Sequence, residues 1–149
     1  MLDYQDTKNF GAYLDRTIKI IKMAYHKAFR EAGIDLTTEQ WVILSSLYDQ
    51  DGQSQIELAE GSYKDATTVS RIIDLLCKKN LTLRERLHHD RRRYKVFITP
   101  EGRKTVEDAL PTVLELRQKG WEGLHEPDYE AFLKILEQIT RNFESKEIV

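Results

Sequence analysis

Three consecutive arginines, Arg91, Arg92 and Arg93, carry the clearest chemical signal in this chain. They follow two histidines and Asp90, in a segment that is too polar to be buried. Guanidinium groups bind phosphate oxygens, and such contacts position a protein on a nucleic acid and make its affinity fall steeply with salt. A solvated loop would have a similar composition. The alternating sequences on both sides and the preceding aspartate favour a nucleic-acid contact.

A second group of polar residues lies at the start of an expected helix. Asp65 is a good N-cap, because it places a short acceptor just before a helical run. Apolar residues recur at helical spacing from Val69 to Leu76, and this spacing leaves four polar residues largely off the buried face. These four are Thr67, Thr68, Ser70 and Arg71. A helix with such an N-terminus suits the major groove of DNA, with Arg71 as a candidate base contact or, alternatively, a surface residue.

The helix that follows Asp65 and a hairpin after it must position the polar residues and the three arginines. Asn80 tolerates the left-handed conformation that ends many helices. The segments LTLRERL, from Leu81, and YKVFIT, from Tyr94, alternate apolar and polar residues as half-buried strands do. The six residues HHDRRR would then connect the two strands as a basic tip. Such a tip reaches phosphates or a minor groove.

Other chemistry has little support in the sequence. His88 and His89 would diverge at a strand end, and the remaining histidines are far away in the chain, so we expect no metal site. Cys77 lies beside an apolar helix position, and we expect it to be buried and inert. The chain has no glycine-rich phosphate loop and no nucleophile motif. We therefore expect neither an enzyme nor a bound cofactor.

Charge separates the middle of the chain from its flanks. Residues 62–104 hold 12 Lys and Arg against 5 Asp and Glu, although the whole chain has a net charge of −2. A basic centre between acidic flanks is typical of a localised phosphate-binding surface. The chain has no long apolar run, no apolar core near its N-terminus and a single cysteine. These features predict a cytoplasmic protein that makes no membrane contact.

Two capping boxes indicate helices ahead of the polar group. Thr37 and Gln40 form the first, at the start of a helix that continues to about residue 49. Ser54 and Glu57 form the second, at the start of a short helix. The free N–H groups at the N-terminus of that short helix make Ser54 and Gln55 candidates for a phosphate contact.

The two ends of the chain are expected to form amphipathic helices. Residues 8–32 carry apolar residues every three or four positions, in a stripe wider than one neighbour needs. Thr99 caps a long helix that starts at Pro100, in which Pro111 predicts a kink or a break. A last helix starts at Pro127 and has a clean apolar stripe. Stripes of this width suggest a partner surface in addition to a core.

These features resemble the winged helix-turn-helix of the MarR family of bacterial transcription regulators. The segment Asp90 to Thr99 fits the family wing pattern Asp-x-Arg-x-x-x-Val-x-Leu-Thr, with Ile98 in place of the usual Leu. The segment Asp65 to Arg71 fits the family recognition-helix pattern Asp-x-Ser/Thr-Thr-Val-x-Arg. The flanking helices also fall where the family has them, so the resemblance covers nearly the whole chain.

The resemblance implies a mainly α fold with a small β-hairpin wing, in a single domain over residues 1–149. Residues 35–104 would form the winged helix that binds DNA, and residues 1–34 and 105–149 would form dimerisation helices. In the family, the arginine at the place of Arg92 enters the minor groove and the aspartate at the place of Asp90 holds it. Twofold dimers present two recognition helices ~34 Å apart, which implies a pseudo-palindromic operator.

One turn departs from the family pattern. Ser62, Tyr63 and Lys64 stand where the family usually has Leu, Gly and Leu. Serine does not fill the space of leucine, and tyrosine does not easily adopt the positive φ that glycine supplies. Lys64 adds a charge close to the expected DNA surface. Ala66 stands where the family often has a longer polar residue, so we expect fewer base contacts and more reliance on Arg71 and the wing.

The function implied by the resemblance is sequence-specific transcriptional regulation by a homodimer, as a repressor that a small molecule releases from double-stranded DNA. Family effectors are small aromatic or phenolic molecules that bind between the dimerisation helices and the winged helix. Tyr13, Tyr25, His26 and Trp41 are candidates for lining such a pocket, with core packing as the plainer interpretation. The alternative function is a protein-interaction module, because winged helices also bind proteins. Its DNA affinity would be weak and independent of sequence.

Overall fold

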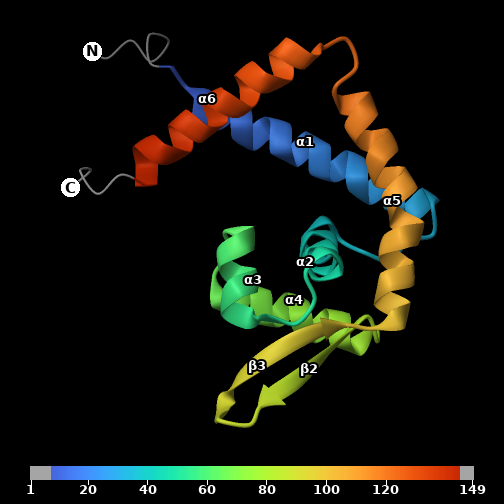
Figure 1. Cartoon of the computed structure of the whole chain (residues 1–149). Coiled ribbons are helices and arrows are strands. Elements are labelled where there is room, and N and C mark those ends of the chain that lie inside the picture. Colours follow the sequence, from blue (N-terminus) through green and yellow to red (C-terminus); the bar gives the residue numbers. More distant parts are fainter. Residues whose placement is uncertain (1–7, 145–149) are drawn as a thin grey trace. The chain divides into compact units, whose positions relative to one another are not determined.

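Helices make up most of the structure, and three short strands pair into one sheet (Figure 1). A computed structural model describes residues 8–144, apart from the side chains of residues 90–92. The elements are α1 (Phe10–Glu31), α2 (Thr38–Asp49), β1 (Gln53–Ser54), α3 (Gln55–Ser62), α4 (Ala66–Lys78), β2 (Thr82–Leu87), β3 (Asp90–Ile98), α5 (Pro100–Gly120) and α6 (Glu126–Glu144). The expected mainly α fold with a small β-hairpin wing is confirmed. The chain divides into two units, of which the first ends at Leu116 and the second begins at Arg117.

Side-chain caps begin α2 and α3 at the expected residues. Thr37 Oγ1 accepts a hydrogen bond from the Gln40 N–H at 3.1 Å, and Gln40 Oε1 accepts one from the Thr37 N–H at 3.2 Å. This pair of bonds confirms the first capping box. Ser54 Oγ accepts a hydrogen bond from the Glu57 N–H at 3.1 Å, which is one of the two bonds of the second box. Such caps satisfy N–H groups that have no partner inside the helix.

The sheet has β3 at its centre, with β1 and β2 both antiparallel to it. The β2–β3 hairpin was expected, whereas β1 was not, because two residues are too few for a periodic signal. Gln53 of β1 pairs with Val96 of β3. β3 already begins at Asp90, so the turn consists of His88 and His89 alone, and the expected six-residue tip is wrong in its extent. Arginines are compatible with an exposed strand, so their polarity did not mark the strand boundary.

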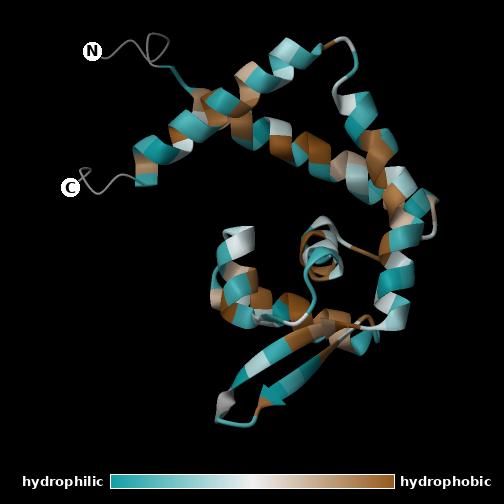
Figure 2. Cartoon of the chain, viewed as in Figure 1, coloured by the Kyte–Doolittle hydropathy of each residue, from teal (hydrophilic) through white to brown (hydrophobic). Residues whose placement is uncertain are grey.

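The core of the first unit gathers the inner faces of α2, α4, β3 and α5 around the C-terminal end of α1. Its completely buried members include Ile43, Leu47, Ile73, Val96 and Val113. Burial of such side chains contributes about 1.5–3 kcal/mol each. α1 differs, because Phe29 is its one buried residue, and the hydrophobic bands along this helix lie on exposed side chains (Figure 2).

One local expectation is wrong, and a second is reduced to one of its two alternatives. Tyr63 ends α3 with φ 53 and ψ 35, so this tyrosine does adopt the left-handed conformation that we expected it to avoid. α5 continues through Pro111, which excludes a break there, while the kink that we named as the alternative stays a prediction. A proline removes one helical hydrogen bond, but Ala109 and Val113 on either side of Pro111 are fully buried and hold the helix in place.

The second unit is a helical hairpin formed by the last residues of α5 and by α6. The Trp121 ring lies edge-on to Tyr129, with ring centroids 5.3 Å apart, and is tilted against Phe132 at 6.0 Å. None of the residues of α6 is buried. Among the helices of residues 8–144, none is both long enough and apolar enough to cross a membrane.

Gly102 provides a test of the packing between the start of α5 and the sheet. A Cβ at this position would lie 2.2 Å from the Leu81 carbonyl oxygen and 2.7 Å from Ile98 Cγ1. We expect Gly102→Ala to lower the free energy of unfolding by roughly 1–3 kcal/mol, because the backbone must move apart. The measurement is urea denaturation followed by circular dichroism.

Gly61→Ala is the matched control, since Gly61 also lies in a helix and an added Cβ would meet nothing within 4 Å. This variant should be neutral or stabilise the protein by up to about 1 kcal/mol. Equal responses of the two variants would contradict the close approach at Gly102.

Candidate nucleic-acid interface

The N-terminus of α4 is held by its cap. Asp65 Oδ1 accepts a hydrogen bond from the Thr68 N–H at 2.7 Å, and Asp65 Oδ2 accepts one from Thr68 Oγ1 at 2.9 Å. These hydrogen bonds to Thr68 lower the pKa of the Asp65 carboxyl group from its ordinary value. The Thr68 hydroxyl is therefore engaged by the cap, while Thr67 is exposed beside it.

The apolar face of α4 decides which of its polar side chains point outward. Val69, Ile73 and Leu76 are completely buried. As a result Arg71 is exposed and Ser70 is half-buried on the outer side. An open hollow on that side is lined by Gln55, Ala66, Thr67, Ser70, Arg71 and Asp74. The structure thus brings together four of the predicted contact residues from α3 and α4.

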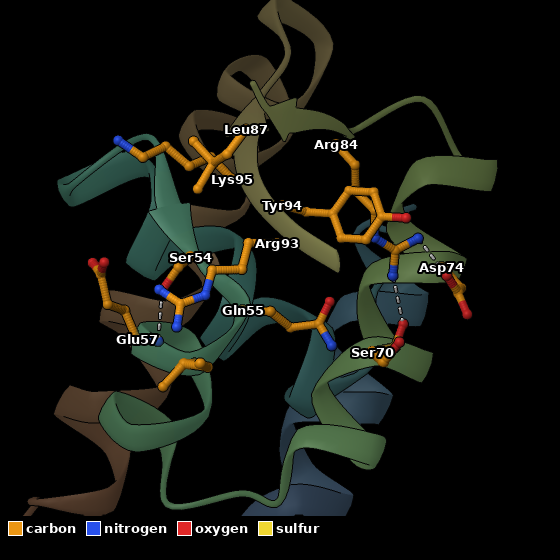
Figure 3. A pocket seen from close by; sticks show the side chains of 11 residues that line it. Ser54, Gln55, Glu57, Ser70, Asp74, Arg84, Leu87, Arg93, Tyr94 and Lys95 are labelled. Carbon is orange, nitrogen blue, oxygen red and sulfur yellow. Dashed lines mark hydrogen bonds and ion pairs between the residues drawn. The ribbon is translucent and has the colours of Figure 1, made fainter. Parts of the chain in front are cut away.

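A larger hollow of about 590 Å³ lies between the N-terminus of α3, the middle of α4 and the wing, where the wing is the β2–β3 hairpin (Figure 3). Its lining includes four predicted residues, which are Ser54, Gln55, Ser70 and Arg93. It also includes Arg84, Tyr94 and Lys95, which the sequence analysis did not select. Basic residues on the strands of a hairpin were the available signal, but we considered basic residues at its tip alone.

Most of the described charged side chains of the wing are exposed. Arg93 and Lys95 are exposed on β3. The Arg86 guanidinium lies over the Tyr94 ring, 5.8 Å from its centroid. The side chains of Asp90, Arg91 and Arg92 lie outside the described residues, so their predicted contacts stay predictions from the sequence. The backbone of all three belongs to β3.

The turn between α3 and α4 is closed by backbone hydrogen bonds. The Lys64 N–H donates to the Ala59 carbonyl at 3.1 Å, and Ser62 Oγ donates to the Leu58 carbonyl at 2.7 Å. Lys64 is half-buried, while the Tyr63 side chain is 83% exposed. The predicted contact residue Lys64 therefore directly precedes the cap of α4, at the end of the helix that carries the other candidates.

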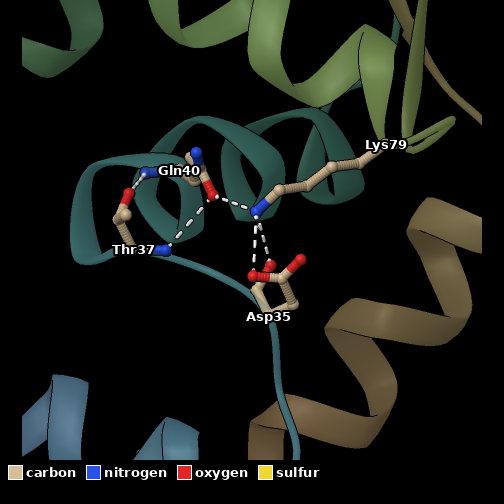
Figure 4. A network of polar contacts seen from close by, with 4 residues as sticks. All are labelled: Asp35, Thr37, Gln40 and Lys79. Carbon is tan, nitrogen blue, oxygen red and sulfur yellow. Dashed lines mark hydrogen bonds and ion pairs between the residues drawn. The ribbon is translucent and has the colours of Figure 1, made fainter.

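The opposite end of α4 is tied to the N-terminus of α2 (Figure 4). Lys79 Nζ donates to the Asp35 carbonyl oxygen at 2.8 Å and to Gln40 Oε1 at 2.9 Å, and it lies 3.3 Å from the Asp35 carboxylate. Gln40 is buried, and its Oε1 also accepts the Thr37 N–H of the capping box. One amide side chain therefore joins the start of α2 to the end of α4.

The predicted effector residues only partly come together. The Phe29 ring contacts Tyr25 at 5.9 Å and Trp41 at 6.2 Å, in edge-to-face arrangements at the contact of α1 with α2. His26 Nε2 accepts a hydrogen bond from the Thr38 N–H at 3.4 Å in the same place. Tyr13 is 72% exposed, three turns earlier on α1, and does not belong to this aromatic group.

The structure also describes the candidate metal ligands and the single cysteine. Among the side chains that the structure describes, which exclude those of residues 90–92, no cluster of three or more His, Cys, Asp or Glu could hold a metal ion. Cys77 is half-buried, which is less than we expected, and its Sγ lies 3.3 Å from Thr82 Oγ1.

The order of elements and the exposed surface define a class of protein. A helix pair, α3 and α4, with a closed turn between its members is followed by a hairpin that pairs with a strand lying before α3. The second helix of the pair exposes its polar N-terminus beside that hairpin. This arrangement is a winged helix-turn-helix, with α4 in the place of the recognition helix.

Comparisons with known proteins narrow the class to a family. The model of the MarR family matches residues 36–94. The transcriptional regulator HosA of Escherichia coli is 25% identical over 105 residues, which are 70% of this chain and 78% of HosA. Over its winged-helix part the chain is therefore similar to the MarR family, and the relatives compared are transcriptional regulators.

Solved structures agree with this assignment. The S. aureus MepR–DNA complex has a TM-score of 0.79 and 28% sequence identity, covering 88% of this chain and 96% of MepR. Bordetella bronchiseptica BpsR, whose DNA binding is regulated by 6-hydroxynicotinic acid, has a TM-score of 0.82 and 26% identity. That match covers 92% of this chain and 96% of BpsR.

The lowered pKa of Asp65 makes the cap of α4 sensitive to acid. Because the folded-state pKa lies below the unfolded-state value, the cap stabilises the protein above the ordinary carboxyl pKa of 3.8 and loses this effect as pH falls through the folded value. We expect Asp65→Asn to lower the melting temperature at pH 7 and to have a smaller effect near pH 3. A carbon-detected NMR titration should place the Asp65 midpoint below 3.8. A midpoint above that value would contradict the cap geometry.

Proposed function

We propose that this protein is a sequence-specific DNA-binding repressor that acts as a homodimer on a pseudo-palindromic operator. The observation that carries this proposal is the common surface around α4, where Thr67, Ser70 and Arg71 lie beside Gln55. An α-helix fits the major groove, where an arginine or small polar side chain can contact base edges. The wing lies next to this surface, and its basic side chains are suited to phosphates or the minor groove.

Charge supports the same surface. Residues 62–104, which include α4 and the wing, hold the basic excess of an otherwise acidic chain. Lys64 directly precedes the cap of α4, and Arg93 and Lys95 lie on the wing that follows α4 in the chain. A localised positive surface attracts DNA even when the net charge of the protein is negative. The MepR–DNA complex shows that a chain of this fold binds DNA, and we extend that property to this protein.

The homodimer is supported by apolar surface that the single chain leaves uncovered. On α1 the exposed large apolar side chains are Phe10, Tyr13, Leu14, Ile18, Ile20, Ile21 and Met23. On α6 they are Tyr129, Phe132, Leu133, Ile135 and Phe143. Helices that expose this much apolar surface mark an interaction site. We propose that residues 1–34 and 105–149 supply the dimerisation helices and residues 35–104 the DNA-binding part.

Release from DNA by a small aromatic or phenolic effector completes the proposal. BpsR, which responds to 6-hydroxynicotinic acid, supports an effector of this size and aromatic character. The aromatic group of Tyr25, Phe29 and Trp41, with His26 beside it, offers ring and hydrogen-bonding contacts at the α1–α2 contact. An effector that prefers one spacing of the two recognition helices would shift the dimer toward that spacing. Such a regulator would work in the cytoplasm.

Binding measurements test the DNA contact. The full chain is titrated onto the DNA upstream of its own gene, onto a scrambled duplex and onto a random library, at several salt concentrations. We expect one preferred site, with Arg71→Ala reducing discrimination by roughly 1–3 kcal/mol and Arg92→Ala weakening binding and lowering the salt slope by about 1. Lys78→Ala, at the other end of α4, is the control and should retain the preference.

Weak binding to every duplex, with no site enriched from the library, would contradict the proposal. The protein-interaction module would then be the better description.

A charge on the apolar face of α1 tests the dimer. Ile18 is 46% exposed on this face, so a glutamate there costs the monomer little but would be buried in the proposed interface. We expect Ile18→Glu to shift the mass in light scattering from twice 17.5 kDa to 17.5 kDa and to weaken operator binding. Lys27→Glu, on the opposite face of α1, should leave the mass unchanged. A wild-type chain that is already monomeric would refute the homodimer.

A further inference from the structure

The outer half of the wing is not oriented by core packing. Val96 is the last completely buried residue on β3 toward the tip, and its partner on β2 is Arg84. Beyond this pair, the described side chains of residues 85–89 and 93–95 are exposed or half-buried. Hydrophobic burial therefore positions the base of the hairpin but contributes little to the direction of its outer half.

Arg84 makes the polar connection at the end of the buried part. Its Nη1 lies 2.5 Å from Asp74 Oδ1, and its Nη2 donates to the Ser70 carbonyl oxygen at 3.1 Å. Ser70 and Asp74 are four residues apart on α4 and so lie on one side of that helix. Figure 3 shows the Arg84 guanidinium reaching from the wing to both of them. The Arg84 side chain is 24% exposed, against 54% for Asp74.

The form of this contact matters as much as its charge. A planar guanidinium that uses two nitrogens against two acceptors fixes an orientation, which a single point contact does not. Arg86, two residues further along the same strand, behaves differently, because its guanidinium lies over the Tyr94 ring within the hairpin itself. Arg84 connects β2 to the recognition helix, whereas the Arg86–Tyr94 contact connects the two strands of the wing to each other.

We infer that Arg84 is a positioning residue that holds the wing in a fixed orientation relative to α4, so that both elements contact the DNA at the same time. This inference rests on the proposed DNA-binding function. We call the contact of Arg84 with Asp74 and Ser70 the brace. When the brace is formed, DNA binding does not have to order the wing relative to α4, so the contacts of α4 and of the wing strengthen each other. Without it, each contact forms separately and the affinity of the pair falls.

The competing role for Arg84 is a direct contact with a DNA phosphate. A substitution at Asp74 distinguishes this role from the positioning role. If Arg84 bound phosphate, Asp74→Asn would free the guanidinium and remove a negative charge near the DNA, so affinity would rise. If Arg84 positions the wing, the same substitution breaks the brace and affinity falls. The two roles therefore predict opposite signs for a single variant.

The experiment uses the full-length protein and the preferred duplex found for the wild type. We expect Arg84→Gln and Asp74→Asn each to weaken binding on the order of tenfold, and the double variant to be no weaker than the single ones, because both remove the same interaction. Arg84→Lys keeps the charge but not the two-pronged geometry and should recover part of the loss. Lys78→Gln, which removes one positive charge from the other end of α4, should change affinity little.

Footprinting supplies a readout that a general loss of stability would not produce. Hydroxyl-radical protection where the wing meets the DNA should disappear in Arg84→Gln, while methylation protection in the major groove under α4 remains. Thermal unfolding of each variant identifies any that is not folded at the temperature of the measurement, and Asp74→Asn and Arg84→Lys then carry the test.

The outcomes separate this inference from the proposed function. A wild-type chain with no preferred duplex overturns both. A wild type with a preferred duplex, together with an Asp74→Asn variant that binds as tightly or more tightly, overturns the positioning role alone and assigns Arg84 to the phosphate backbone. Loss of wing and major-groove protection in parallel would also overturn the positioning role.

Discussion

Burial of one face of α4 is the constraint on which the rest of the winged helix depends. Val69, Ile73 and Leu76 are completely buried against the other elements of the core, and each contributes about 1.5–3 kcal/mol. A helix with one face fixed in this way has a single rotation open to it. The polar side chains of Thr67 and Arg71 therefore point outward together, without needing any contact of their own to direct them. The candidate DNA surface is in this sense a consequence of core packing.

Polar contacts lie at both ends of α4, and those at its C-terminal end tie it to α2. Asp65 caps the N-terminus of α4, while Lys79 beyond its C-terminus reaches Asp35 and the buried Gln40. The same Gln40 oxygen also accepts the Thr37 N–H in the capping box of α2, so one side-chain amide contacts both the start of α2 and the end of α4. His26 of α1 accepts a hydrogen bond at the same end of α2. The α1–α2 contact is therefore connected to the end of α4 through the N-terminus of α2 and Lys79.

Local signals in the sequence were sufficient for most elements, because caps and periodicity depend on near neighbours. The capping box at Thr37 and the left-handed Asn80, with φ 61, follow from such signals. The strand β1 depends on a distant partner, and Arg84 looks like any outward-facing arginine until α4 is placed beside it. Alternation predicts which side chains leave the core, but it does not predict what they meet there. This is why the outward-facing polar residues of α4 were foreseen, whereas the contact of Arg84 with α4 was not.

The turn before α4 shows how backbone hydrogen bonds close a helix end at a residue other than glycine. A left-handed conformation costs a residue other than glycine roughly 1–2 kcal/mol, and Tyr63, at 83% exposed, regains little by burial. The turn nevertheless closes, because the Tyr63 N–H donates to the Glu60 carbonyl and the Lys64 N–H to the Ala59 carbonyl. These bonds are the ones that a glycine turn would make. The tyrosine therefore lowers stability, but the turn before α4 still closes with both backbone hydrogen bonds.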